Sequence, residues 1–182
     1  MKKLVFFVAL IPFTLCGCKH QTEAEKSLLN SLTYLQKAEI IGVPNEKALP
    51  GLSPYLSKNL IRTLKSANKI EDDYAAQTKE SDPGLSEGWN LFFGVYEGPT
   101  SFKTLFCRTE GDHAVAVVEF TLKDPNTPEP EIWQRKAYLV KESGHWVIDD
   151  LADMPQAKAH ESPSLKAQLK TFIQTKGRLV KK

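Results

Sequence analysis

Residues 113–122 read HAVAVVEFTL, and this stretch decides the fold class. Every second residue of this stretch is apolar, at positions Ala114, Ala116, Val118 and Phe120. Successive side chains of a β-strand point to opposite faces of a sheet, so this period is typical of a strand with a buried face. We therefore predict a strand over residues 113–122.

The same period extends over the neighbouring sequence. Further strands are predicted over 104–109, 132–140 and 145–151, with turns at 110–112 and 142–144 and a proline-containing loop at 124–128. Strands that follow one another through short turns pair antiparallel. The second half of the chain is therefore predicted to form an antiparallel meander.

Helical spacing of apolar residues precedes these strands. The first predicted helix ends at Gly42 and has a face of aliphatic residues: Leu28, Leu29, Leu32, Leu35, Ile40 and Ile41. Ser53 is expected to cap a short turn with Pro54 at its first position. Ser57 is predicted as the N-cap of a longer helix with one apolar stripe: Leu60, Ile61, Leu64, Ala67, Ile70 and Tyr74. A short helix is expected between Ser164 and Gly177.

Helices followed by a meander predict an α+β fold, with N-terminal helices packed on a curved antiparallel sheet and a short C-terminal helix. The chain has 182 residues, of which 41% are hydrophobic and 25% charged, as in ordinary globular proteins. A chain of this size buries most of its apolar surface without metal or disulfide staples. One globular domain is therefore expected.

The first residues differ from the rest of the chain. Lys2 and Lys3 precede an apolar run over residues 4–11, and small or thiol residues follow at 14–18. A basic head, an apolar body and a small-residue cleavage region are typical of a secretory leader. The run is broken by Pro12 and is shorter than the roughly 20 residues that a transmembrane helix needs. A retained membrane-spanning anchor is therefore the weaker interpretation.

Two cysteines close this leader, in the sequence Leu15-Cys16-Gly17-Cys18. The sequence resembles the lipobox of bacterial lipoproteins, although Cys16 stands where a small residue is more common. The resemblance implies that Cys18 is acylated and becomes the first residue of the mature chain. It also implies an outer-membrane location facing the periplasm, because Lys19 replaces the Asp that retains enteric lipoproteins in the inner membrane.

The chain is accordingly divided into four segments. A lipoprotein signal peptide spans 1–17, a lipidated N-terminus and tether spans 18–26, a single globular α+β domain spans 27–177 and a basic tail spans 178–182. The whole chain has 24 Lys and Arg against 22 Asp and Glu, and the leader removes two lysines and no acid. The balanced charge of the mature chain does not favour nucleic acid as a partner.

Cysteine and histidine residues do not predict a metal site. The mature chain keeps only Cys107 as a free thiol, so no intrachain disulfide is expected and a buried thiol is favoured over a catalytic one. The four histidines, at positions 20, 113, 145 and 160, lack ligand spacing around the cysteines. We expect neither a metal nor a cofactor.

An aromatic cluster follows the helical half. Trp89, Phe92, Phe93 and Tyr96 lie among glycines, and together with Tyr55 they are candidates for a ligand pocket or a partner surface. Plain core packing under a long loop is the favoured interpretation of the cluster.

Asp149 and Asp150 are the best candidates for a catalytic carboxylate in this sequence. Alternation along the predicted strand places only one of them on the inner face, so a paired acid and base is geometrically doubtful. Their favoured role is structural: to end the strand and accept hydrogen bonds from the backbone or from Arg135 on the preceding strand. No nucleophile elbow or phosphate-binding loop is found in the sequence, so no enzyme activity is expected.

Three segments together resemble one family: residues 52–57 (LSPYLS), residues 81–83 (SDP) and the strand at 145–151 (HWVIDDL). They resemble bacterial lipoproteins with a YbjP-type domain of unknown function, a family similar to the nuclear transport factor 2-like superfamily. This resemblance implies a cone-shaped sheet able to enclose a pocket, in which some relatives use a buried carboxylate as a general base. It implies no catalytic set for this chain.

The leading hypothesis is a non-enzymatic accessory or binding domain for an envelope protein complex, held in the membrane by its N-terminal lipid. One alternative is a small-ligand or enzyme domain that uses an inward Asp in a cone pocket. Another is a periplasmic immunity protein that neutralises a toxin.

Overall fold

The alternating stretch at 113–122 forms a strand with the predicted bounds. A computed structural model of the chain describes residues 21–78, 90–154 and 163–176. Its elements, in chain order, are α1 (Glu23–Ala38), α2 (Leu49–Leu52), α3 (Lys58–Thr78), β1 (Ser101–Glu110), β2 (His113–Leu122), β3 (Glu131–Glu142), β4 (His145–Asp153) and α4 (Leu165–Gln174). The predicted α+β fold, with helices first and a short C-terminal helix, is confirmed.

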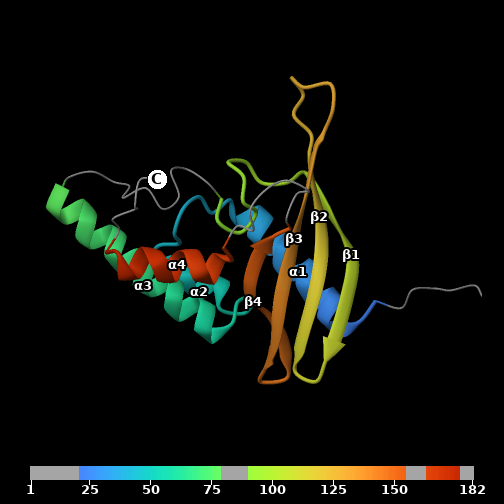
Figure 1. The fold of residues 1–182 in the computed structure, drawn as a ribbon, viewed down its shortest axis with the longest axis horizontal. Coiled ribbons are helices and arrows are strands. Elements are labelled where there is room, and N and C mark those ends of the chain that lie inside the picture. Colours follow the sequence, from blue (N-terminus) through green and yellow to red (C-terminus); the bar gives the residue numbers. More distant parts are fainter. Residues whose placement is uncertain (1–20, 79–89, 155–162, 177–182) are drawn as a thin grey trace, which may run out of the picture.

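The four strands form one antiparallel sheet in the order β1-β2-β3-β4 (Figure 1). The register aligns small and aliphatic residues across its inner face, from Cys107 through Ala116 and Ala137 to Leu151. Phe120 lies at the centre of an aromatic cluster on the same face, with its ring 5.6 Å from Phe93, 6.1 Å from Phe102 and 5.6 Å from Trp133. These rings form part of the hydrophobic core on the inner face of the sheet.

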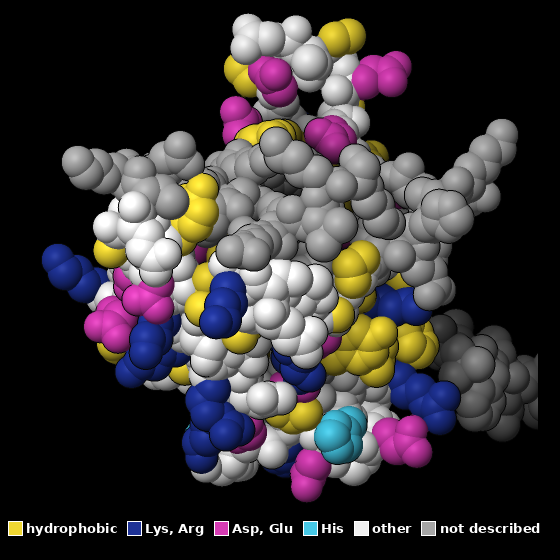
Figure 2. All heavy atoms as spheres, turned by 60° about the vertical axis from the view of Figure 1, so that its left-hand side comes forward, with side chains coloured by type: hydrophobic (Ala, Val, Ile, Leu, Met, Phe, Trp, Pro, Cys, Tyr) yellow, Lys and Arg dark blue, Asp and Glu magenta, His cyan; other side chains and the backbone are white. Residues whose placement is uncertain are grey.

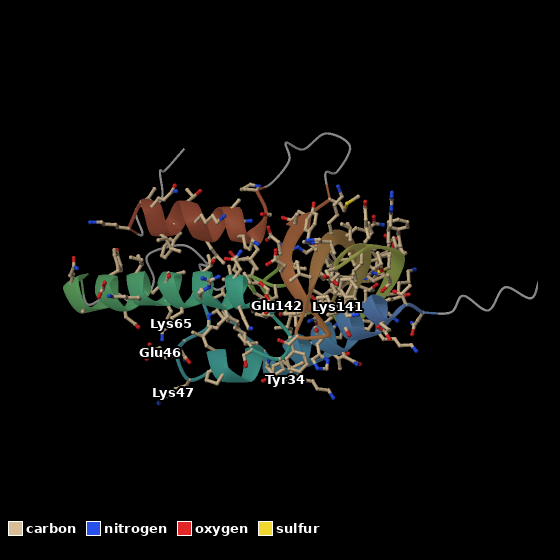
Figure 3. All side chains as sticks on the ribbon, turned by 90° about the horizontal axis from the view of Figure 1, so that it is seen from below. Tyr34, Glu46, Lys47, Lys65, Lys141 and Glu142 are labelled. Carbon is tan, nitrogen blue, oxygen red and sulfur yellow. The ribbon has the colours of Figure 1, made fainter. Side chains whose placement is uncertain are left out.

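Helix α1 covers the inner face of the sheet, whereas α3 and α4 pack side by side beyond the β4 edge (Figures 1 and 3). The predicted spacing of α1 is confirmed, because Leu28, Leu32 and Leu35 are fully buried. The stripe of α3 is likewise buried at Leu60, Leu64 and Ala67. The helices therefore bury their apolar stripes as the 3.6-residue period requires.

The ends of α1 differ from the prediction. The helix begins at Glu23, capped by the side chain of Thr22, so part of the expected tether forms its first turn. It stops at Ala38, because Glu39 adopts a left-handed conformation with φ 46°. Ile40 still packs against the core, but the side chain of Ile41 is 62% exposed. The prediction that Ile41 belongs to the buried face is wrong, because the helix has already ended.

The turn after α2 also differs. Ser53 follows α2 at its C-terminal end, where its N–H and its Oγ both donate to the carbonyl of Pro50. Ser53 and Pro54 do lie in a turn, in which Tyr55 N–H donates to Leu52 O at 3.0 Å, but the predicted capping by Ser53 is wrong because its hydroxyl bonds back to Pro50. The chain then pairs with β4, because Ser57 N–H donates to Ile148 O at 2.8 Å and Ile148 N–H donates to Tyr55 O at 2.9 Å. Residues 55–57 thereby cover the β4 edge.

Candidate functional site

The structure separates the candidate residues into different environments. Phe92 and Arg135 are buried, Tyr96 is 57% exposed, and Tyr55, Asp149 and Asp150 are half-buried. Leu15, Cys16, Gly17, Cys18 and Trp89 lie outside the described residues. The candidates that the structure describes therefore do not line one shared pocket.

Arg135 attaches the segment before β1 to the sheet. Its side chain is 3% exposed, and its Nε lies 2.8 Å from Asp153 Oδ1. Its Nη1 donates to the carbonyls of Leu91 and Phe92. Burial lowers the pKa of Arg135, and the charge of Asp153 acts in the opposite direction. Arg135 is thus a positioning residue, and the predicted pairing with Asp149 or Asp150 is replaced by a pairing with Asp153.

The segment held by Arg135 is a tight turn. Asn90 Oδ1 accepts from the N–H groups of Phe92 and Phe93, and the indole N–H of Trp133 donates to Phe93 O at 2.9 Å. Gly94 follows with φ +74°, and a Cβ there would lie 3.4 Å from Asp153 Oδ1. Both the backbone conformation and the close approach favour glycine. Phe92 and Phe93 are fully buried, so the core-packing interpretation is confirmed for them.

Directly after this turn, Tyr96 lines a cleft at the C-terminal end of α1. The cleft has a volume of about 460 Å³ and also contains Ile41, Glu39, Glu97 and Pro99. The side chain of Gln36, on α1, donates to the carbonyl of Pro99 and so fixes one wall to the other. We name this feature the Ile41–Tyr96 cleft. Among the described residues, Ile41 and Tyr96 are the two most exposed large hydrophobic side chains.

Asp149 and Asp150 lie beside the first turns of two helices. The register shifts between Tyr138 and Leu139 of β3, so Asp149 is the extra residue of a β-bulge in β4, which interrupts the alternation on which the prediction depended. Asp149 accepts from Ser57 Oγ and from Lys166 Nζ, both at 2.6 Å. Asp150 accepts from the backbone N–H of Lys166 at 2.9 Å and from Ser164 Oγ at 2.7 Å.

These contacts join β4 to the N-termini of α3 and α4. Carboxylates are favourable there, because the first turn of a helix presents unpaired N–H groups and a positive dipole end. The contacts support the structural role of both carboxylates over proton abstraction from a ligand.

The hydroxyl of Ser57 is central to this junction. It accepts from Leu60 N–H at 3.0 Å, as the predicted N-cap of α3, while it donates to Asp149. We expect Ser57→Ala to lower the free energy of unfolding by about 1–2 kcal/mol, because an N-cap and a buried hydrogen bond are lost together. Urea denaturation measures the change. Ser66→Ala on the exposed side of α3 is the control, and an equal effect of both substitutions would contradict the assignment.

Tyr55 belongs to a second cleft, of about 600 Å³, between α1 and the β3–β4 turn. Its ring stacks on Tyr34 of α1, with centroids 4.2 Å apart. Figure 3 shows Tyr34 on the same side of the molecule as Lys141 and Glu142 of that turn. Trp146 and Lys58 also line this cleft, but Trp146 is only 7% exposed. The stacking of Tyr34 on Tyr55 therefore mainly holds α1 against the segment that precedes α3.

Cys107 packs against the core but is only half-buried, so the expected burial of this thiol is partial. Burial raises the pKa of its thiol, which the hydrogen-bond contact with Thr22 partly offsets and the charge of Glu25 reinforces. A thiol with a raised pKa forms little thiolate at neutral pH, and thiolate is the reactive form. These surroundings do not favour a catalytic cysteine.

The described parts of the chain are residues 21–78, 90–154 and 163–176. Within those ranges, no group of three His, Cys, Asp or Glu side chains is arranged to hold a metal ion. No helix in the same ranges combines the length and the apolar character that crossing a membrane requires.

No protein-family model and no curated protein matches this sequence. Among solved structures, one similar chain is described as an NTF-2 like protein of unknown function from Shewanella oneidensis MR-1. It shares 14% sequence identity over 68% of this chain and 92% of its own length, with a TM-score of 0.33. Its description carries the superfamily name implied by the sequence resemblance. The superposition is too loose to transfer that superfamily's properties to this chain.

Sequence reasoning missed Ile41 as a surface residue. Its side chain follows four buried positions of helical spacing, so the pattern alone favoured continuing the helix through it. The signal that opposed this interpretation was Gly42-Val43-Pro44, which shows that the chain leaves the helix nearby. The turn at Glu39, two residues before Ile41, was not marked by glycine or asparagine.

Proposed function

We propose that this chain is a lipoprotein anchored in the outer membrane, where it faces the periplasm as a non-enzymatic binding domain for an envelope protein complex. The observation that carries the binding role is the Ile41–Tyr96 cleft. The two most exposed large hydrophobic side chains of the described residues meet in this one depression, at 62% and 57% exposure. Apolar side chains that gather on a surface are typical of interaction sites.

The chemistry of the cleft suits a protein segment. Tyrosine is enriched at the energetic centres of interfaces, and a depression of about 460 Å³ accommodates one or two side chains. Glu39 and Glu97 place carboxylates beside the apolar walls. Complementarity of charge therefore favours a partner that presents an apolar side chain flanked by Lys or Arg.

The cleft also has fixed walls. One wall is the end of α1 and the other is the segment that Arg135 and Trp133 hold on the sheet. Gln36 joins the two walls through Pro99. Rigid walls reduce the entropy that a binding site loses when its partner docks.

Membrane anchoring is supported by the leader and by the lipobox resemblance at residues 15–18. Each buried methylene of an acyl chain contributes about 0.8 kcal/mol, so two or more chains hold a protein stably in a bilayer. Anchoring confines the domain to the membrane of its partner, which raises the effective concentration for a weak interface. Mass spectrometry of the mature N-terminus tests the anchor, and an unmodified Cys18 or an intact leader would refute it.

The binding role predicts a specific loss of partner capture. We expect the double substitution Ile41→Ser with Tyr96→Ser to reduce crosslinked partner recovered from cell envelopes at least tenfold, because both apolar walls are removed. Quantitative mass spectrometry of the crosslinked material measures the loss.

The matched control is Ile132→Ser, which alters another isoleucine of similar exposure, 55%, that does not line the cleft. Recovery with the control should equal that of the parent protein. Equal recovery from the cleft variant and the control would refute this surface as the binding site. Circular dichroism of each variant confirms that the fold is retained.

A further inference from the structure

The N-terminal end of α1 lies against β1. Thr22 caps the helix, and its Oγ1 is 3.7 Å from the sulfur of Cys107 in the middle of β1. In Figure 1 this end of α1 lies at the β1 edge, whereas the opposite end of the helix lies toward β4. The chain therefore enters the domain beside β1.

The distance from this point to the proposed anchor is short. Cys18 precedes Thr22 by four residues. A fully extended chain spans at most about 3.6 Å per residue, so the Cα atoms of Cys18 and Thr22 are no more than about 14 Å apart. An acylated Cys18 lies at the bilayer surface, so β1 must lie close to that surface as well.

β1 presents apolar side chains to solvent where a soluble strand would be polar. Its register shifts between Thr104 and Phe106, so Leu105 is an extra residue in a β-bulge. Leu105 is 40% exposed and Phe106 is 53% exposed. Figure 2 shows hydrophobic side chains beside Lys and Arg side chains toward the right of the view.

We propose that Leu105 and Phe106 contact the bilayer that holds the anchor, and that this contact orients the domain. The inference rests on the proposed lipidation of Cys18. The occupant is a lipid surface because the tether brings one within reach of β1. Leu105 and Phe106 enter the boundary between headgroups and acyl chains, where apolar side chains of surface-bound proteins are buried.

Ion pairs near Leu105 and Phe106 limit how much electrostatic attraction contributes to the contact with the bilayer. Lys103 Nζ lies 2.8 Å from Glu119 Oε1, and an Arg108 nitrogen lies 4.0 Å from Glu110 Oε2. The basic side chains on either side of the bulge are thus largely balanced by acids. We expect the contact to depend weakly on anionic lipid and on salt, because the apolar side chains supply most of the attraction.

The length of α1 sets how far the Ile41–Tyr96 cleft lies from the chain entry point. α1 has 16 residues, which correspond to about 24 Å at 1.5 Å per residue. Thr22 precedes one end of this helix, and Gln36 and Glu39 of the cleft lie at the other. The cleft therefore lies about one helix length from the chain entry point, beside Pro99 and Thr100 at the start of β1.

Tryptophan reporters test the contact. The mature lipidated protein is reconstituted into vesicles of phosphatidylethanolamine and phosphatidylglycerol with brominated acyl chains. Three single variants are compared, Leu105→Trp, Phe106→Trp and Ile132→Trp, and the fluorescence of the parent protein is subtracted from each. Bromine quenches tryptophan at short range. We expect the signals of the first two reporters to be quenched at least threefold more than that of the third.

The outcomes separate the two proposals. Lipidated protein that floats with the vesicles, but shows equal quenching of all three reporters, would overturn the β1 contact and leave the anchor intact. Mature protein that lacks lipid and remains in solution would overturn the anchor itself. Replacing phosphatidylglycerol by phosphatidylcholine should change the quenching by less than twofold, and abolition of the quenching would contradict the apolar origin of the contact.

Discussion

Phe120→Ala should lower the free energy of unfolding by about 3–5 kcal/mol, which is the usual cost of truncating a fully buried phenylalanine. The ring is completely buried and is flanked by the rings of Phe93, Phe102 and Trp133. Alanine would remove three aromatic contacts at once and leave a cavity between the sheet and the segment before β1. Urea denaturation followed by far-ultraviolet circular dichroism measures the change.

The matched control is Phe106→Ala, which removes the same side chain from a neighbouring strand of the same sheet. Phe106 is 53% exposed, so its truncation should change the free energy of unfolding by no more than about 0.5 kcal/mol in the absence of membranes. A loss below about 1 kcal/mol for Phe120→Ala would show that the aromatic cluster is not the centre of the core.

Arg135→Ala should lower the free energy of unfolding by about 3 kcal/mol. Removing one partner from a buried, hydrogen-bonded ion pair costs about 3–5 kcal/mol, and the lower end applies because the Asp153 side chain is 41% exposed. The substitution would leave the carbonyls of Leu91 and Phe92 without their donor. Those carbonyls belong to the turn that precedes Tyr96, and Asn90 of this turn lines the Ile41–Tyr96 cleft, so partner capture should fall as well.

Hydrogen exchange distinguishes this local effect from general instability. Gly94 N–H donates to Asn90 O at 2.8 Å within the turn that Arg135 holds. Its protection should fall in Arg135→Ala more than that of amides in the middle of β2. Arg108→Ala, at a side chain 73% exposed, is the control and should leave stability within about 0.5 kcal/mol of the parent. Unchanged protection of Gly94 would contradict the positioning role of Arg135.

Local periodicity predicted most of the secondary structure. The bounds of β2 were predicted correctly from alternation alone, Ser57 was identified as the N-cap of α3, and α4 was expected to follow Ser164, which caps it in the structure. These features depend on neighbouring residues, because strand and helix periods and caps involve side chains only a few positions apart. The assignment of Phe92 and Phe93 to the core followed from composition.

The candidate site depended on contacts between distant segments. Asp149 interacts with Ser57, 92 positions away, and Arg135 interacts with a turn more than 40 positions earlier. The bulge opposite Tyr138 turned both carboxylates toward the helix ends, which a strict period of two does not foresee. The surface role of Ile41 likewise depended on a left-handed turn at Glu39 that the local sequence does not mark.

The sequence by itself indicated which segments form helices and strands, and its first 18 residues are the basis on which the lipid anchor is proposed. Only the tertiary structure decided which carboxylate pairs with Arg135, which aromatic side chains remain at the surface, and which strand lies next to the chain entry point. The physical reason is that helix and strand periods are set within a few residues, whereas pairing and exposure are set by segments that meet only when the chain folds.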